Sequence, residues 1–245
     1  MKRAAAFLLC ACSAFGVQAQ TTVGMTLGAE RLSNNSPDWR EATVHAQHQY
    51  GPRHTAGLAL SRTERFDLRD SQFSANYARP VGERLVASID ANASSTHRVL
   101  ARHAAGGALQ YEFAPAWLVH AGARTTKYDA ERVNQGLLML EHYFSAFSMA
   151  VAWRPARAFD STAHSGELRG AYYYGDRNSI GLILAGGKEA ANIAGAVTLT
   201  SLRSAALVGR HWFTRDWALN YSAGHTRQGD FYSRNGISLG LQYAF

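Results

Sequence analysis

Apolar and polar residues alternate in this sequence with a period of two, and the pattern recurs along most of the chain. In the first such segment the apolar positions are Val23, Met25, Leu27 and Ala29. Successive side chains of a β-strand point to opposite faces, so this period predicts strands with one apolar and one polar face. No segment keeps apolar residues at helical spacing over several turns. We therefore predict an all-β fold.

About fourteen segments of this kind can be marked, within a range of 12 to 16. They lie near residues 22–32, 39–50, 55–66, 71–80, 84–95, 104–114, 117–128, 134–145, 147–157, 165–175, 178–188, 199–213, 217–228 and 233–245. Tight turns alternate with longer connections, which we expect at residues 33–38, 95–103, 158–164 and 189–198. Short turns at one end and longer loops at the other are typical of an outer-membrane barrel, and an even strand number leaves both termini at the periplasmic end.

The main alternative is a soluble β-sandwich or a closed soluble barrel. Such folds collect their aromatic residues in a core and have shorter strands. Here the aromatic residues flank the expected connections, as Trp117 and Trp217 do, which suits the two interfaces of a bilayer. The longest uncharged stretch, residues 190–202, is too short for a helical membrane span. We predict a transmembrane antiparallel up-and-down β-barrel.

The first nineteen residues have the composition of a secretory signal peptide. Lys2 and Arg3 precede an apolar stretch, and Val17-Gln18-Ala19 is a small-residue cleavage site. We expect cleavage after Ala19, which leaves residues 20–245 as a single barrel domain. An N-terminal anchor would need a longer apolar run. A second alternative is lipoprotein processing, with Cys12 acylated.

Cysteine content and charge exclude several other classes of protein. Both cysteines, Cys10 and Cys12, lie in the leader, so the mature chain can form neither a disulfide nor a thiolate metal site. Loss of Lys2 and Arg3 lowers the formal net charge from +7 to +5, and the basic residues are scattered singly. We therefore expect no nucleic-acid partner and no cofactor.

The last segment ends the chain on an aromatic residue. Its alternating apolar positions finish with Leu241, Tyr243 and Phe245. A terminal Phe on an amphipathic strand resembles the signal that the barrel-insertion machinery of the outer membrane recognises. We expect Tyr243 and Phe245 to carry that signal.

Three stretches resemble the YaiO family of outer-membrane β-barrel proteins. They are residues 36–41 (Ser-Pro-Asp-Trp-Arg-Glu), residues 210–217 (Arg-His-Trp-Phe-Thr-Arg-Asp-Trp) and residues 229–245. With them the resemblance spans essentially the whole mature chain. It implies an outer-membrane location and no established catalytic residues.

Two patterns that could carry catalysis or metal binding have a plainer explanation. Residues 236–240 match G-x-S-x-G, but that motif works on a strand-to-helix turn, and Ser238 falls in the middle of a strand. The odd spacing of His45 and His48 sends their side chains to opposite faces. We predict neither a catalytic site nor a metal site.

The polar face of the strands is expected to line the barrel lumen. Its candidate residues are Glu41, His45, Asp90, Glu112, His120, Arg124, Arg154, Glu167, Arg169 and Gln242. These side chains could form salt-bridge ladders that fill the interior, or they could line a polar conduit. The leading hypothesis is a non-enzymatic barrel, either a narrow channel for a small hydrophilic solute or a component of surface-polysaccharide export. The alternatives are a lipid-modifying enzyme and a structural or adhesive barrel.

Arginines are concentrated near the expected outer loops. We expect Arg62, Arg65, Arg69, Arg98 and Arg102 to contact outer-membrane lipid, with bidentate bonds to lipopolysaccharide phosphates. The alternative is a general match to an anionic outer leaflet, without a specific site.

Overall fold

The computed structural model describes residues 20–193 and 196–245. The predicted signal peptide, its cleavage site and Cys12 lie outside the described residues.

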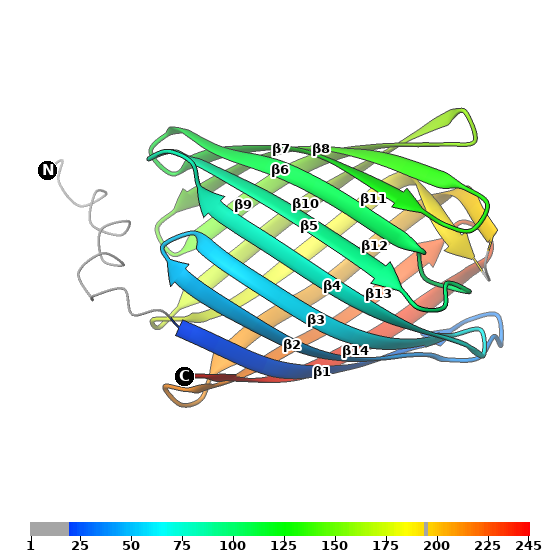
Figure 1. The fold of residues 1–245 in the computed structure, drawn as a ribbon, viewed down its shortest axis with the longest axis horizontal. Helices are drawn as coiled ribbons and strands as arrows, with labels where there is room; N and C mark the ends of the chain where they lie inside the picture. The colour runs from blue at the N-terminus through cyan, green and yellow to red at the C-terminus, as the bar shows by residue number, and fades with distance from the viewer. Residues whose placement is uncertain (1–19, 194–195) are drawn as a thin grey trace, which may run out of the picture.

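The described chain forms one closed antiparallel β-barrel of fourteen strands (Figure 1). Each strand pairs with its neighbours in sequence, and β1 pairs with β14 to close the barrel. The strands are β1 (Gln20–Leu32), β2 (Trp39–Gly51), β3 (His54–Arg65), β4 (Leu68–Pro80), β5 (Leu85–Ser94), β6 (His103–Ala114), β7 (Trp117–Lys127), β8 (Arg132–Phe144), β9 (Phe147–Ala158), β10 (Ser161–Tyr174), β11 (Asn178–Ile193), β12 (Ala196–Trp212), β13 (Trp217–Gln228) and β14 (Tyr232–Ala244). The predicted fold class is confirmed. No helix among the described residues is long and apolar enough to cross a membrane.

The two ends of the barrel are distinguished by the chain termini, which both lie at the same end. The start of β1 and the end of β14 lie together at one end, on the left in Figure 1, with the turns that follow the even-numbered strands. We call this the inner end, and the opposite end the outer end. The two longest connections, residues 33–38 and 95–102, lie at the outer end. Because the longer loops of outer-membrane barrels are extracellular, we expect the inner end on the periplasmic side.

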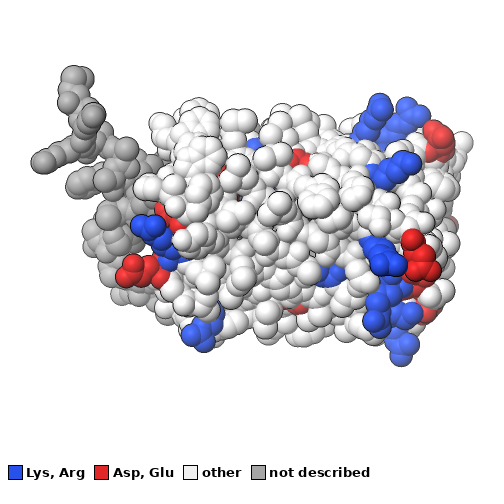
Figure 2. All heavy atoms as spheres, turned by 90° about the horizontal axis from the view of Figure 1, so that it is seen from above, with Lys and Arg blue, Asp and Glu red and all other residues white. Residues whose placement is uncertain are grey.

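The outward face of the wall is apolar between two charged ends. Met25 and Leu27 of β1 are 47% and 54% exposed and point outward, whereas the intervening residues point inward. Figure 2 shows Lys, Arg, Asp and Glu gathered at the two ends of the molecule, with a nearly uncharged zone between them. A lipid-facing band flanked by polar ends is the surface that a bilayer requires.

Aromatic rings form a continuous row on the outward face near the inner end. Trp117 stacks on His142 with ring centroids 4.0 Å apart, and the row continues through Phe144, Phe147 and Tyr172. Amphipathic rings prefer the membrane interface, so this row marks one edge of the lipid-facing band.

The closing strand places both residues of the predicted insertion signal on the outward face. Tyr243 lies directly opposite Val23, and its ring is 4.9 Å from that of Trp217. Phe245 is 70% exposed, and its backbone N–H donates to Thr21 O at 2.8 Å. Their recognition by the insertion machinery stays a prediction.

The prediction of a long loop is wrong at two of the four positions. Residues 158–164 contain only a two-residue turn, Phe159-Asp160, between β9 and β10. Residues 189–198 mostly extend β11 and β12, which pair from Glu189↔Thr200 to Ile193↔Ala196. Beyond the membrane both faces of a strand meet water, so the apolar-polar alternation fades there although the backbone pairing continues.

The conformation of the turn at Phe159-Asp160 explains why a tight turn was not predicted there. Both residues have positive φ, 50° and 56°, and the same holds at Phe66-Asp67, with 53° and 61°. Positive φ at both central residues is the signature of a type I′ hairpin, which normally selects Asn or Gly. The Phe-Asp dipeptide carries no such signal.

Candidate functional site

The candidate site is the interior of the barrel, and one wall of it carries charges paired across strands. Asp90 of β5 and Arg124 of β7 form an ion pair. Farther round the wall, Glu167 of β10 bonds both Arg154 and Arg169, at 3.4 Å in the case of Arg154 Nη2. Charges of both signs therefore neutralise one another along this wall.

A glycine makes the Asp90–Arg124 pair possible. Gly106 of β6 lies directly opposite Asp90 on one side and Arg124 on the other. A Cβ at this position would be 2.9 Å from Asp90 Oδ1 and 3.3 Å from both Arg124 Cβ and Ala123 O. The two side chains meet across the space that Gly106 leaves empty.

A second polar group on this wall combines a predicted residue with one that the sequence analysis missed. His120 Nε2 of β7 and Glu141 Oε2 of β8 are 3.0 Å apart. The two residues are not direct register partners, because Glu141 lies opposite Leu118. Parity along a strand predicts the face of a residue, but it does not identify a partner on the diagonal.

The opposite wall, formed by β1 and β12–β14, carries small side chains. Thr26, Gly28, Ser222, Gly224 and Ser238 line a cavity of about 370 Å³ there. Small residues on one wall leave the space that the charged side chains of the other wall do not fill.

Ser238, the central residue of the G-x-S-x-G match, belongs to this small-residue wall. It lies in the middle of β14, opposite Gly28, and its Oγ is 2.7 Å from Ser222 Oγ. A nucleophilic serine needs an adjacent general base. The hydrogen-bond partner of the Ser238 hydroxyl is a second hydroxyl, so the geometry is not that of an activated nucleophile.

The outer mouth of the interior is narrowed by an aromatic and cationic cluster, which we call the Trp39 cluster. Trp39 is 4% exposed, and the guanidinium carbons of Arg65 and Arg234 lie 4.7 and 4.8 Å from its ring centroid. Phe66 and Tyr232 pack edge-on against the same ring, at 5.2 and 5.6 Å. Arginine on an aromatic face contributes about 0.5–1 kcal/mol at exposed sites and more when desolvated.

The position of Arg65 over Trp39 contradicts the expectation that this arginine contacts lipopolysaccharide. That residue was expected on the lipid-facing rim with four other arginines, but it faces inward and lines the cavities of the outer mouth. The physical reason is parity, because Arg65 shares the inward face of β3 with Thr63, which is opposite Glu41. Arg62 and Arg69 do face outward. Arg98 and Arg102 lie on the loop between β5 and β6.

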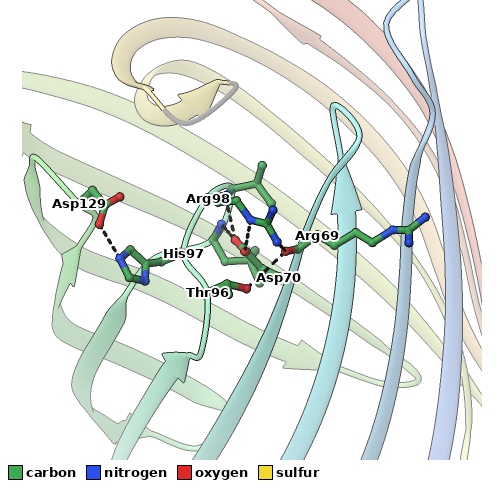
Figure 3. Close-up of polar contacts among 8 residues, drawn as sticks. Arg69, Asp70, Thr96, His97, Arg98 and Asp129 are labelled. Atoms are coloured by element: carbon green, nitrogen blue, oxygen red, sulfur yellow. Dashed lines mark hydrogen bonds and ion pairs between the residues drawn. The ribbon is translucent and has the colours of Figure 1, made fainter.

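This loop, residues 95–102, is held at the outer mouth by a buried carboxylate (Figure 3). Asp70 is 1% exposed, and its Oδ2 accepts the backbone N–H groups of Val99 and Leu100 at 2.7 and 2.8 Å. Arg98 adds an ion pair to Asp70 Oδ1 at 3.8 Å and donates to Arg69 O at 2.8 Å. Bonds to a charged acceptor are worth about 1.5–3 kcal/mol each.

The anchored loop contributes apolar residues to the mouth of the interior. Val99 and Ala101 are buried, and with Leu100 they line a cavity of about 350 Å³ together with the Trp39 cluster. At the loop's other side His97 Nε2 lies 2.6 Å from Asp129 Oδ1 (Figure 3). Burial raises the pKa of Tyr128, another residue of this cavity, so its phenol adds no charge at neutral pH.

At the inner end the interior opens into a polar cavity of about 410 Å³. Its lining includes His45, Gln47, Arg210, Asn220 and Gln242. The imidazole of His45 lies close to Gly24, where an added Cβ would be only 2.7 Å from it. Asn220 Nδ2 donates to Gln242 Oε1 at 3.4 Å.

All ten residues expected in the lumen lie on the inward face by strand register, but they do not form one site. Glu112 binds the N–H of Ala116 in the inner turn, at 3.3 Å. Glu41 bonds Thr43 and Thr63 near the outer mouth. Trp39, Arg234 and Asp70 were missed, because their roles depend on contacts between distant strands. Among the described residues no group of three His, Cys, Asp or Glu side chains could hold a metal ion.

The sequence matches the model of the YaiO membrane beta barrel domain over residues 20–192. The chain belongs to the YaiO family. That match covers more than half of the chain and extends from β1 into β11. No curated protein matches this sequence.

Solved structures of outer-membrane barrels resemble this YaiO-family barrel in fold. The Acinetobacter baumannii outer membrane protein Omp33 gives a TM-score of 0.60 at 11% identity, over 94% of this chain and 100% of that one. The CymD monoaromatic hydrocarbon channel gives 0.58 at 12%, over 92% and 87%. A bacterial polysaccharide outer membrane secretin gives 0.57 at 11%, over 93% and 98%. At these identities the likeness is one of fold alone.

Proposed function

We propose that this YaiO-family barrel is a non-enzymatic, narrow channel through which a small hydrophilic solute crosses the outer membrane. The observation that carries the proposal is a series of cavities along the interior. Thr26 lines both the inner-end cavity and the central one, and Trp39, Arg65 and Arg234 line both the central cavity and that of the outer mouth. The shared lining residues make the three cavities neighbours, which supports one path through the interior.

The charge arrangement supports a polar solute without strong ion selectivity. Asp90 with Arg124, and Glu167 with Arg154 and Arg169, are compensated pairs or triads. Arg169 is still 45% exposed on the inward face, so water reaches the paired charges. Pore selectivity follows the charge and hydrogen-bonding groups of the lining, and here both signs are present.

The outer mouth sets the size limit in this proposal. The Trp39 cluster and the loop of residues 95–102 line the same cavity of about 350 Å³. Trp39 fills that mouth with the largest apolar side chain and is held by two arginines. A solute must therefore pass beside the indole.

The other hypotheses have less support. The polysaccharide secretin shares the fold at 11% identity, which carries no substrate to this chain. An enzyme would need an activated nucleophile or base, and Ser238 is bonded to Ser222. We also infer export through cleavage of residues 1–19 and membrane insertion through the strand that ends at Phe245.

Solute uptake tests the proposal. The mature chain is refolded into liposomes that are then mixed with neutral sugars of increasing size, and swelling is followed by light scattering. The wild type should admit the smallest sugars only. Trp39→Ala should raise the size limit, whereas Trp217→Ala, an outward change at the inner end, should leave it unchanged. Folded barrels that admit no sugar in either form would contradict the proposal.

A further inference from the structure

A cationic groove lies on the outward face of the wall, at the outer end of β10–β13. Lys188, Arg203 and Arg227 line it with His164, and its volume is about 480 Å³. All four side chains are exposed. The proposed conduit uses none of them, because they face away from the lumen.

The register brings like charges together in this groove. Arg203 of β12 lies directly opposite Arg227 of β13, and Lys188 of β11 lies opposite Ser201, two residues from Arg203. Like charges in directly opposed positions destabilise an antiparallel pair. A bound anion would offset that repulsion.

The protein itself neutralises this charge only in part. Asp230 Oδ1 lies 3.4 Å from Arg227 Nη2, and this carboxylate is fully exposed. Within residues 20–193 and 196–245, no carboxylate forms an ion pair with Lys188 or Arg203. The groove therefore holds an uncompensated pair of cations beside a third that is weakly paired.

Two neighbouring glycines of β11 lie beside these cations, and one of them, Gly187, lines the groove. Gly186 lies directly opposite Arg203, and its nearest neighbour for an added Cβ is Leu202 O at 3.8 Å. Gly187 has φ of +133°, and a Cβ there would come within 2.4 Å of His164 O. Any other residue at Gly187 would strain the strand, so this part of the groove lacks a side chain because the backbone requires glycine there.

The groove lies at the boundary between the polar rim and the lipid-facing band. Toward the membrane centre the outward face continues through Gly186 and Ala205 to Leu184 and Leu207, which are 41% and 43% exposed. At its side Trp153 stacks on His164 with ring centroids 5.7 Å apart, as expected of an interfacial aromatic residue. A ligand that fits has an anionic head for the cations and acyl chains for the leucines.

We propose that this groove binds the phosphate of a phosphorylated glycolipid of the outer leaflet, namely the lipid A part of lipopolysaccharide. Arginine forks match phosphate oxygens bidentately, and two opposed forks with one lysine can surround a single phosphate. This site differs from the set expected from sequence. In that predicted set of five arginines, Arg69 Nε is paired to Glu64 at 2.9 Å, and Arg65 faces inward.

Lipid-induced thermal stabilisation of the refolded mature barrel tests the site. The midpoint of heat-modifiable gel migration is measured with lipid A, with dephosphorylated lipid A and with inorganic phosphate. A ligand that binds only the folded state raises the midpoint by an amount that grows with the logarithm of its concentration relative to its Kd. Lipid A alone should stabilise the wild type, and Arg203→Gln/Arg227→Gln should weaken its apparent affinity at least tenfold. Lys188→Gln, a milder change, should weaken it severalfold.

The matched control is Arg79→Gln/Arg84→Gln, which removes two exposed arginines at the inner end. It should respond to lipid A as the wild type does. Three results would overturn the proposal: unchanged affinity in the folded groove variants, equal stabilisation by dephosphorylated lipid A, or equal stabilisation by inorganic phosphate. The last result would indicate a free anion as ligand. Neither channel activity nor its absence bears on these outcomes.

Discussion

At the residue scale, glycines on the inward face determine which polar side chains can come into contact. Gly106 separates Asp90 from Arg124, and Gly24 makes room for His45. Neither glycine stood out in the sequence, where both read as ordinary polar-face positions of a strand. The face of each residue follows from parity, but the need for glycine follows from neighbours that are distant in sequence. Steric space on the inward wall therefore has to be read from the structure.

Gly106→Ala should destabilise the barrel, because its Cβ would meet Asp90 Oδ1 at 2.9 Å and the backbone oxygen of Ala123 at 3.3 Å. Overpacking of this kind costs about 1–3 kcal/mol. The measurement is the urea midpoint of the refolded protein in detergent.

Gly28→Ala is the matched control, since its nearest neighbours would be 3.7 and 3.8 Å away. Replacing an unstrained glycine by alanine should stabilise by about 0.4–1 kcal/mol through the unfolded state. Equal effects of the two changes would show that steric space at Gly106 is not what matters.

At the element scale, the strands inside the membrane were predictable and their outer extensions were not. The alternation marked all fourteen strands, because lipid on one side imposes a strict period. Beyond the membrane that constraint ends, so the alternation fades and does not reveal that β11 continues to Ile193. The anchor of the loop of residues 95–102 was hidden for another reason. Asp70 lies outside the predicted segment of β4, and its partners are about thirty residues away.

Asp70→Ala should release the loop of residues 95–102 from the outer mouth. Two backbone N–H groups would lose a charged acceptor, at about 1.5–3 kcal/mol each. We expect faster tryptic cleavage after Arg98 and Arg102 in the folded barrel, by at least tenfold. Asp160→Ala, at an exposed outer turn, should leave the cleavage rate unchanged. A loop equally protected in both variants would mean that Asp70 does not hold it.

Strand parity can be tested with single cysteines, since residues 20–245 contain none. In proteoliposomes a charged, membrane-impermeant thiol reagent should modify Ser61→Cys, on the inward face of β3, much faster than Leu60→Cys, which is 63% exposed but faces lipid. We expect a rate ratio above about tenfold, because lipid excludes a charged reagent. Comparable rates would contradict the orientation of β3.

At the scale of the whole molecule, the barrel joins a lipid-facing exterior to a polar interior with charges of both signs. Family membership and fold follow from the sequence, while the narrowing of the outer mouth follows from contacts among β1, β2, β3 and β14. Arg234 is the residue that links these features, because it lies over Trp39 and pairs with Glu30 at 3.5 Å. Its charge therefore lies where the central cavity and the cavity of the outer mouth share lining residues.

Arg234→Gln should shift ion preference toward cations, since Glu30 would lose its partner. A unit charge at about 4 Å contributes ~1 kcal/mol in water, which corresponds to a change of up to about fivefold in relative permeability. Reversal potentials under a salt gradient measure this ratio. Arg79→Gln, at the outward face of the inner end, should not alter it.

Single-channel conductance in planar bilayers tests the central claim most directly, with heat-modifiable migration confirming the folded barrel in the same sample. A continuous path through the interior predicts reproducible small conductance steps with weak ion selectivity, enlarged in Trp39→Ala. Folded barrels that remain silent, in the wild type and in Trp39→Ala alike, would contradict the account of the interior as a conduit.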